Sequence, residues 1–248
     1  MNHEADNRSG FTIIELTLAM TFVSVLLIVI ALTVIQIITI YNRGLTMQQV
    51  DQAGRAISTD IRQTLSQSQP FSISTALCLQ KQLGACGASA NDAYGGRLCT
   101  GTYSYVWNLS DSLSHNIHVN VYDNGVNKEI RFIRVRDNGG RYCANPDAKI
   151  NESDATQLLD KGGHIALQSF NIAEIAKDPT TNEALYRVVM EIGTDDLSTV
   201  DRTASSSGAI DTIDTSCKPP SDSSSLQDFC AINHFDFTAL AGNKGGNT

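Results

Sequence analysis

An uncharged, mostly apolar run of 26 residues, Leu16–Tyr41, constrains this chain more than any other feature. A helix rises about 1.5 Å per residue, so a helical run of this length reaches about 39 Å and exceeds the roughly 30 Å hydrocarbon layer of a bilayer. We therefore predict that this run spans a membrane once. Glu15 stands directly before the run, where a carboxylate costs free energy unless it is exposed or paired.

The ten residues before the apolar segment are polar and end in Gly10. A secretory signal would place a basic start before a short apolar core, with a cleavage site of small residues behind that core. Here the order differs, since the polar residues are followed by an apolar run with no such site behind it. Cleavage after Gly10 would leave the apolar segment on the mature chain.

The segment SGFTIIEL, Ser9–Leu16, resembles the class III signal of the type IV prepilins. The resemblance implies that a prepilin peptidase cuts the bond between Gly10 and Phe11 and that Phe11 is then N-methylated. It also implies that Glu15 docks on the amino terminus of a neighbouring subunit, and that residues 1–10 are a cytoplasmic leader. The alternative is an uncut signal anchor in which Glu15 extends toward the lipid head groups.

The apolar pattern becomes periodic after Leu45. The apolar or small residues recur every three or four positions, which predicts one buried stripe on a helix: Met47, Val50, Gly54, Ile57, Ile61 and Leu65. Pro70 is a natural stop. We predict one helix from Phe11 to Gln67, in which 11–43 is the transmembrane or filament-core part and 44–69 is amphipathic. The stretch Asp51–Arg62 resembles the larger minor pilins and pseudopilins of the W and J types.

Residues 70–248 form a head that we predict to be rich in β-strands and to lie outside the cytoplasm. The sequence favours strands at 102–109, 116–122, 128–136, 164–175, 184–192 and 229–240. It favours irregular structure at 71–100, at most a short helix at 144–160, and a long exposed loop at 193–225. Strands in hairpin order predict an antiparallel sheet that buries one face against the helix. The predicted fold class is therefore α+β, and it resembles that of the type IV pilins.

All six cysteines lie in the head, which indicates disulfides and an oxidising compartment. Six cysteines allow 15 pairings. Cys217 and Cys230 stand apart from the others and are expected to pair, which is worth about 3 kcal/mol in the chain-entropy model. This pair also resembles the carboxy-terminal disulfide loop of many pilins. The simplest remainder is Cys78–Cys86 and Cys99–Cys143.

The net charge of −8 disfavours non-specific attraction of the whole chain to nucleic acid or anionic lipid. One basic cluster near Trp107, Tyr103 and Tyr105 is a weak candidate for contact with DNA or a surface ligand: Arg131, Arg134, Arg136 and Arg141. The more ordinary interpretation is a set of strand-edge charges. Acidic residues of the 193–225 segment are weak calcium candidates, although no EF-hand spacing is present: Asp195, Asp196 and Asp201.

No nucleotide-binding, hydrolase or metalloprotease motif is present in the sequence, so we expect a structural protein without a cofactor. The resemblance implies a minor, tip-proximal or assembly-initiating subunit of a type IV pilus or related filament. Its implied partners are other pilins through the amino-terminal helix, the prepilin peptidase, the inner-membrane assembly platform and, before assembly, membrane lipid. It would be a single-pass membrane protein before assembly and part of an extracellular or periplasmic filament afterwards. The alternatives are a type II secretion pseudopilin and a single-span surface protein for adhesion or DNA binding.

Overall fold

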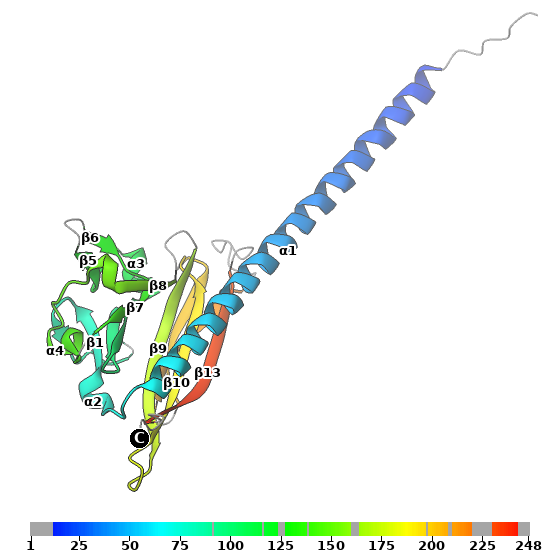
Figure 1. The fold of residues 1–248 in the computed structure, drawn as a ribbon. Helices are drawn as coiled ribbons and strands as arrows, with labels where there is room; N and C mark the ends of the chain where they lie inside the picture. Colours follow the sequence, from blue (N-terminus) through cyan, green and yellow to red (C-terminus); the bar gives the residue numbers. More distant parts are fainter. Residues whose placement is uncertain are drawn as a thin grey trace, which may run out of the picture. The chain divides into compact units, whose positions relative to one another are not determined.

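The computed structural model divides the chain into two compact units, Met1–Asn42 and Arg43–Thr248, which are described separately. One long helix, α1 (Ile13–Gln67), runs through both (Figure 1). The structure describes residues 12–90, 92–115, 117–123, 127–137, 139–159, 164–196, 198–207, 210–219 and 230–242.

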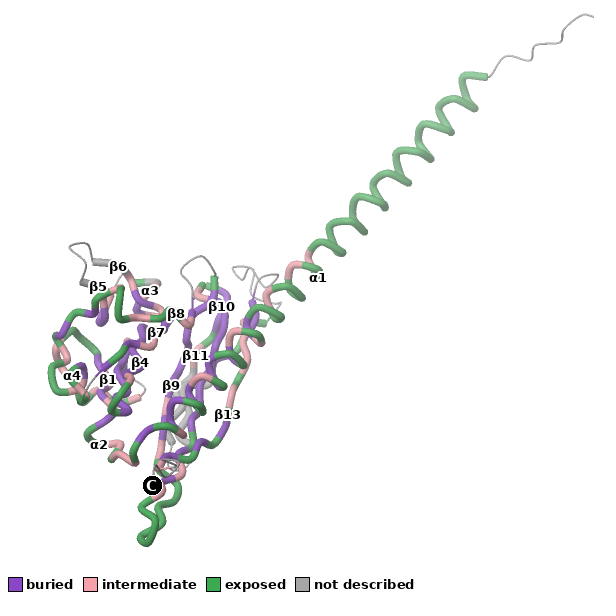
Figure 2. Tube along the Cα trace, viewed as in Figure 1, coloured by how far each residue is buried: buried purple, intermediate pink, exposed green. Residues whose placement is uncertain are grey.

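The surroundings of the α1 side chains change along the helix (Figure 2). In the first unit its apolar side chains are exposed all round, as the unbroken apolar sequence predicts for a segment with no partner of its own. In the second unit one stripe is buried, and it contains five of the six predicted residues: Val50, Gly54, Ile57, Ile61 and Leu65. The prediction is wrong for Met47, which is 55% exposed. The helix ends at Gln67 as expected; its predicted first residue, Phe11, lies outside the described residues.

Two antiparallel sheets make up most of the second unit. The first has the strand order β2-β1-β3-β4-β7-β8, and the second has the order β13-β10-β9. Strands of the first sheet are β1 (Leu77–Gln82), β2 (Ala85–Cys86), β3 (Gly95–Cys99), β4 (Tyr103–Asn108), β7 (Phe132–Arg136) and β8 (Ala155–Leu159). Strands of the second sheet are β9 (Ile165–Lys177), β10 (Ala184–Thr194) and β13 (Ile232–Ala241).

Two hairpins and four short helices complete the described part of this unit. The hairpins are β5 (Val121–Asp123) with β6 (Asn127–Glu129), and β11 (Val200–Ser207) with β12 (Ile210–Cys217). The short helices are α2 (Ile73–Ala76), α3 (Ser110–Ser114), α4 (Arg141–Ala144) and the 3-10 helix η1 (Glu152–Asp154).

The main core lies between the buried stripe of α1 and the facing sides of both sheets. Trp107 of β4 and Phe170 of β9 join the two sheets, with ring centroids 4.6 Å apart. A polar contact fixes α1 to the first sheet: the Tyr105 hydroxyl donates to Oδ2 of Asp60 at 2.7 Å, and Arg134 pairs with Oδ1 of the same carboxylate. The amphipathic half of α1 is thus held by both sheets at once.

A second, smaller core covers the other face of β4 and β7 and includes Tyr122, Ile130 and Tyr142. Arg97 is buried beside it and donates to Oδ1 of Asn120 at 2.7 Å and to the carbonyl of Tyr142 at 3.2 Å. Burial lowers the pKa of Arg97 to about 10, so this side chain stays charged at neutral pH. Its hydrogen bonds tie three separate segments of the chain together.

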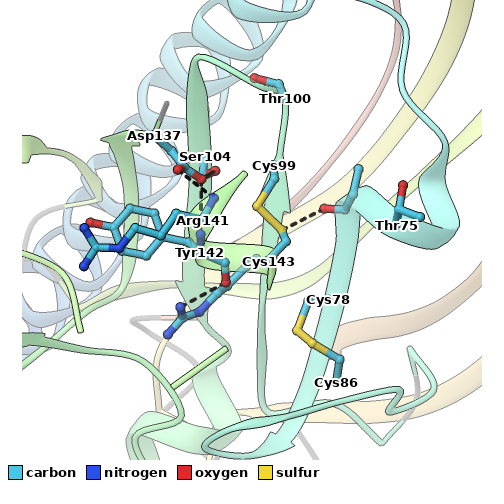
Figure 3. The surroundings of a disulfide bond; sticks show 12 residues. Thr75, Cys78, Cys86, Cys99, Thr100, Ser104, Asp137, Arg141, Tyr142 and Cys143 are labelled. Carbon is cyan, nitrogen blue, oxygen red and sulfur yellow. Dashed lines mark hydrogen bonds between the residues drawn. A yellow bond between two sulfur atoms is a disulfide. The ribbon is translucent and has the colours of Figure 1, made fainter. Parts of the chain in front are cut away.

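Three disulfides staple the second unit, and they join the cysteine pairs that the sequence favoured: Cys78–Cys86, Cys99–Cys143 and Cys217–Cys230. Figure 3 shows the first two near each other. Cys143 is brought to β3 by α4, whose start is held by the buried carboxylate of Asp137. That carboxylate accepts from the Ser104 hydroxyl at 2.6 Å and from the Arg141 amide at 2.9 Å.

Several strand predictions are wrong. Segment 71–100 contains β1, β2 and β3 instead of irregular structure, and 144–160 contains β8. The predicted loop 193–225 contains the β11–β12 hairpin, whose residues are mostly Ser, Thr and Asp. The predicted strand 116–122 begins only at Val121. These strands form because a partner strand supplies their backbone hydrogen bonds. The local composition of a segment does not indicate whether it will have such a partner.

Gly54 and Gly44 offer a matched pair of substitutions on α1. A Cβ at Gly54 would lie 2.0 Å from the Phe235 ring, whereas a Cβ at Gly44 would have no neighbour within 4 Å. We expect Gly54→Ala to destabilise the second unit by about 1–3 kcal/mol through overpacking. Gly44→Ala should stabilise α1 by up to about 1 kcal/mol. Chemical denaturation of the full chain in detergent micelles measures both, and an equal gain in stability for the two variants would contradict the packing of α1 on β13.

Candidate functional site: the amino-terminal end of α1

The predicted processing residues, Gly10 and Phe11, lie outside the described residues. The described chain begins at Thr12, one residue before α1 starts. What the structure does describe at this end is the surroundings of Glu15, the residue predicted to dock on a neighbouring subunit.

Glu15 and Thr12 form a reciprocal pair of contacts at the start of α1. Oε2 of Glu15 accepts from the Thr12 amide and from the Thr12 hydroxyl, both at 3.0 Å. The Glu15 amide in turn donates to the Thr12 hydroxyl oxygen at 3.3 Å. This arrangement is a capping box, in which a Ser or Thr before the helix and a Glu or Gln three residues later satisfy two free backbone amides. The spacing Thr-x-x-Glu is visible in the sequence, and our sequence analysis missed it.

The capping box gives Glu15 a role within a single chain. A carboxylate in the first turn lies at the positive end of the helix dipole, which offsets part of the cost of its charge. Both contacts use Oε2, so Oε1 has no hydrogen-bond partner among the described residues. The carboxylate is therefore oriented by its own helix while one oxygen stays available to a cation.

The segment after Glu15 is the part of the described chain that is long and apolar enough to cross a membrane. The most apolar 18-residue window of α1 has a mean hydropathy of 2.9, and none of it is buried. Such a surface needs lipid or other apolar helices around it. The candidate site therefore combines an oriented carboxylate with an exposed apolar helix.

The four arginines of the predicted basic cluster do not form one exposed basic surface. Arg131 is 11% exposed, pairs with Asp195 at 2.8 Å and donates to the Ile165 carbonyl. Arg134 pairs with Asp60, while Arg136 and Arg141 are exposed. Of the three aromatic residues expected beside them, Trp107 and Tyr105 are buried in the main core, whereas the Tyr103 ring lies 4.9 Å from the Arg134 guanidinium. Two of the four charges are thus already neutralised by carboxylates, and this cluster gains no support as a DNA contact.

The three predicted calcium ligands do not form a metal-binding group in the described structure. The Asp195 carboxylate pairs with Arg131, and Oδ1 of Asp196 accepts from the Ser198 amide at 2.8 Å. Asp201 is an exposed residue of β11. Among the described residues, no group of three His, Cys, Asp or Glu side chains could hold a metal ion.

Glu191 of β10 is a buried carboxylate that the sequence did not single out. Its side chain is 6% exposed and lies 3.5 Å from Nδ1 of His234 on β13. Burial raises its pKa above the ordinary value of 4.5, although the neighbouring Thr215, His234 and Ser169 act in the opposite direction. We assign Glu191 to the packing of β12 on the second sheet, because Thr215 of β12 is among its neighbours.

The raised pKa of Glu191 has a consequence for stability. A carboxyl group that binds its proton more tightly in the folded state stabilises that state below its unfolded pKa of about 4.5. This contribution is lost as the pH rises through the folded pKa. Glu191→Gln should therefore unfold at higher denaturant concentration than the parent chain at pH 8, with a smaller difference at pH 4.5. At each pH, the denaturation midpoint of the variant is compared with that of the parent chain, so that the effects of other titrating groups cancel. A larger gain for Glu191→Gln at pH 4.5 than at pH 8 would contradict the raised pKa of Glu191.

Comparisons with protein-family models, curated proteins and solved structures find no match to this chain. The fold stated here, a long apolar amino-terminal helix with antiparallel β-sheets, therefore comes from the structure itself. The function has to be argued from the chemistry of the residues described above.

Proposed function

We propose that this chain is a structural subunit of a type IV pilus or related filament, processed by a prepilin peptidase. One observation carries the proposal. The oriented carboxylate of Glu15 stands at the start of an apolar helix whose side chains are exposed on every side. A helix of this kind is stable in lipid and equally stable in a bundle of similar helices, so the chain can pass from one surrounding to the other.

The proposed mechanism assigns a separate role to each part of the amino-terminal segment. The apolar helix inserts the chain into the membrane, and the peptidase cuts after Gly10. The new amino terminus at Phe11 carries a positive charge, which a carboxylate nearby stabilises in an apolar surrounding. Glu15 of an adjacent subunit supplies that carboxylate, and Oε1 is the oxygen not used by the capping box.

The size of the chain and its Asp51–Arg62 resemblance favour a minor subunit near the tip or one that initiates assembly. The mature chain would be long for the bulk subunit of a filament, at 238 residues after loss of the ten-residue leader from the 248. The same features fit a type II secretion pseudopilin, which is the second candidate.

Mass spectrometry of the protein purified from the native membrane tests the processing step. We expect an amino terminus at Phe11 bearing one methyl group, and no peptide containing residues 1–10. Gly10→Val should keep the leader, because a β-branched side chain replaces hydrogen at the cleaved bond. An intact Met1 in the mature parent protein would overturn the proposal in favour of an uncut anchor.

Three substitutions separate the docking role of Glu15 from its capping role. Glu15→Gln removes the charge but keeps an oxygen that can complete the capping box. Thr12→Ala removes the hydroxyl but keeps the charge, and Glu15→Ala removes both functions of Glu15. We expect both Glu15 variants to insert normally and to be depleted at least about tenfold from sheared filaments, as a lost ion pair of more than about 1.4 kcal/mol would require. Thr12→Ala should be incorporated within about threefold of the parent.

The outcome for Glu15→Gln decides between the two roles. If this variant is incorporated as well as the parent while Glu15→Ala is not, the helix cap explains the residue and the docking role fails. Normal incorporation of all three variants into filaments would contradict both the docking role and the capping role of Glu15. Membrane fractionation of each variant is the control, because reduced insertion would lower incorporation for a different reason.

A further inference from the structure

Three polar side chains lie together between the second sheet and the β11–β12 hairpin. They are Ser169 of β9, Glu191 of β10 and Thr215 of β12. Ser169 and Glu191 are paired directly across β9 and β10, and both Ser169 and Thr215 are neighbours of the Glu191 carboxyl group. All three residues are buried, with exposures of 7%, 5% and 6% in that order along the chain. Three strands thus bring polar side chains to one buried place.

Each of these side chains has an oxygen atom without a hydrogen-bond partner among the described residues: Oγ of Ser169, Oε2 of Glu191 and Oγ1 of Thr215. Buried polar atoms in native proteins are nearly always hydrogen-bonded, and a group of exceptions calls for a bound water molecule or ion. The three side chains are neighbours, but these oxygens do not bond one another. One small ligand between them would therefore satisfy all three oxygens at once.

The charges around the Glu191 carboxylate do not balance. Arg202 of β11 acts on Glu191, but its guanidinium pairs with Asp111 at 3.3 Å and donates to the Gln168 carbonyl at 3.2 Å. His234 of β13 lies 3.5 Å from the other carboxylate oxygen, Oε1, and is a cation only when it is protonated. With neutral His234, two carboxylates and one guanidinium leave a formal charge of −1. A buried charge is costly unless it is paired or binds a metal ion.

The chemistry of these groups fits a hard monovalent cation. A carboxylate and two hydroxyls are oxygen ligands, which hard cations prefer over nitrogen and sulfur. One positive charge matches the single negative charge of the site, whereas a divalent cation would leave a buried excess charge and takes about six to eight oxygen ligands when it is calcium. Among the described residues, no group of three His, Cys, Asp or Glu side chains could hold a transition metal here.

We propose that Ser169, Glu191 and Thr215 bind one hard monovalent cation, for which sodium is the probe, between the second sheet and the β11–β12 hairpin. Thr215 stands two residues before Cys217, whose disulfide partner, Cys230, directly precedes the residue before β13. The cation would join the hairpin to β9 and β10 close to the point where this disulfide joins it to β13. The site would act in the same way whether or not the chain enters a filament.

Chemical denaturation of the full chain in micelles of a non-ionic detergent tests the site at pH 8. Sodium chloride is compared with choline chloride at the same concentration, about 0.3 M, because choline is too large for a buried site of this kind. A cation that binds only the folded chain lowers the unfolding equilibrium constant by a factor set by its concentration and its Kd. We expect this constant to be at least about fivefold lower in sodium chloride than in choline chloride.

Three substitutions each remove one ligand: Ser169→Ala, Thr215→Val and Glu191→Gln. Each should reduce the sodium effect to less than about twofold. Because the two salts are compared for each variant separately, the cost of the substitution itself cancels. Thr238→Val is the matched control, since Thr238 is an exposed residue of β13, and it should keep the full sodium effect. The gain in stability of Glu191→Gln over the parent at pH 8 should also be smaller in sodium chloride, because the cation stabilises only the parent.

Equal stability of the parent chain in the two salts would overturn the proposal, because a water molecule would then account for the unpartnered oxygens. A sodium effect that stays unchanged in Ser169→Ala and Thr215→Val would also overturn it, since the ion would then bind elsewhere. Hydrogen–deuterium exchange read by mass spectrometry gives a second measurement. Sodium should slow exchange in Ile210–Cys217 of the parent, and slowing confined to other strands would contradict the assigned ligands.

Discussion

The second half of α1 is the element on which the rest of the second unit depends. Its buried stripe from Val50 to Leu65 packs against both sheets, which also meet through Trp107 and Phe170. Tyr105 and Arg134 of the first sheet hold Asp60, and Phe235 of the second sheet lies against Gly54. Without this helix, the apolar faces of both sheets would be exposed to water, at a cost of about 25 cal/mol for each Å².

The same helix has a different requirement in the first unit. There its apolar side chains have no partner in the chain, so their stability comes from a surrounding medium of lipid or other helices. The capping box between Thr12 and Glu15 satisfies free amides at the start of this segment, where water is scarce near a bilayer. In this way one residue, Glu15, completes the helix end and keeps an oxygen for an external cation. The proposed docking of Glu15 on an external cation is compatible with the capping box, because it would use the other carboxylate oxygen.

Much of the architecture could be predicted because the relevant signals are local. The 3- and 4-residue spacing from Val50 to Leu65 is a property of the helix itself, and the buried stripe follows it. The strands at 102–109, 164–175 and 184–192 have β-branched and aromatic residues that indicate strands without knowledge of their partners. The cysteine pairs could be favoured from spacing and isolation along the chain. Met47 does not follow the pattern, since its side chain is 55% exposed.

Other features depended on contacts between distant segments, so the sequence contained no direct signal of them. The polar residues of β11 and β12 become strands because each supplies the hydrogen bonds of the other. Arg131 and Arg134 looked like a basic surface, but Asp195 and Asp60, which neutralise them, lie 64 and 74 residues away in the chain.

The sequence by itself determined that this chain has one membrane-compatible helix, a carboxylate at its start and a disulfide-containing β-rich head. These properties follow from the composition and spacing of neighbouring residues, and hydrophobicity and helical periodicity act over those short distances. Only the tertiary structure decided which charges are neutralised and which polar segments become strands. Those properties arise when residues far apart in the chain are brought within a few ångströms, since ion pairs and hydrogen bonds act only at such range.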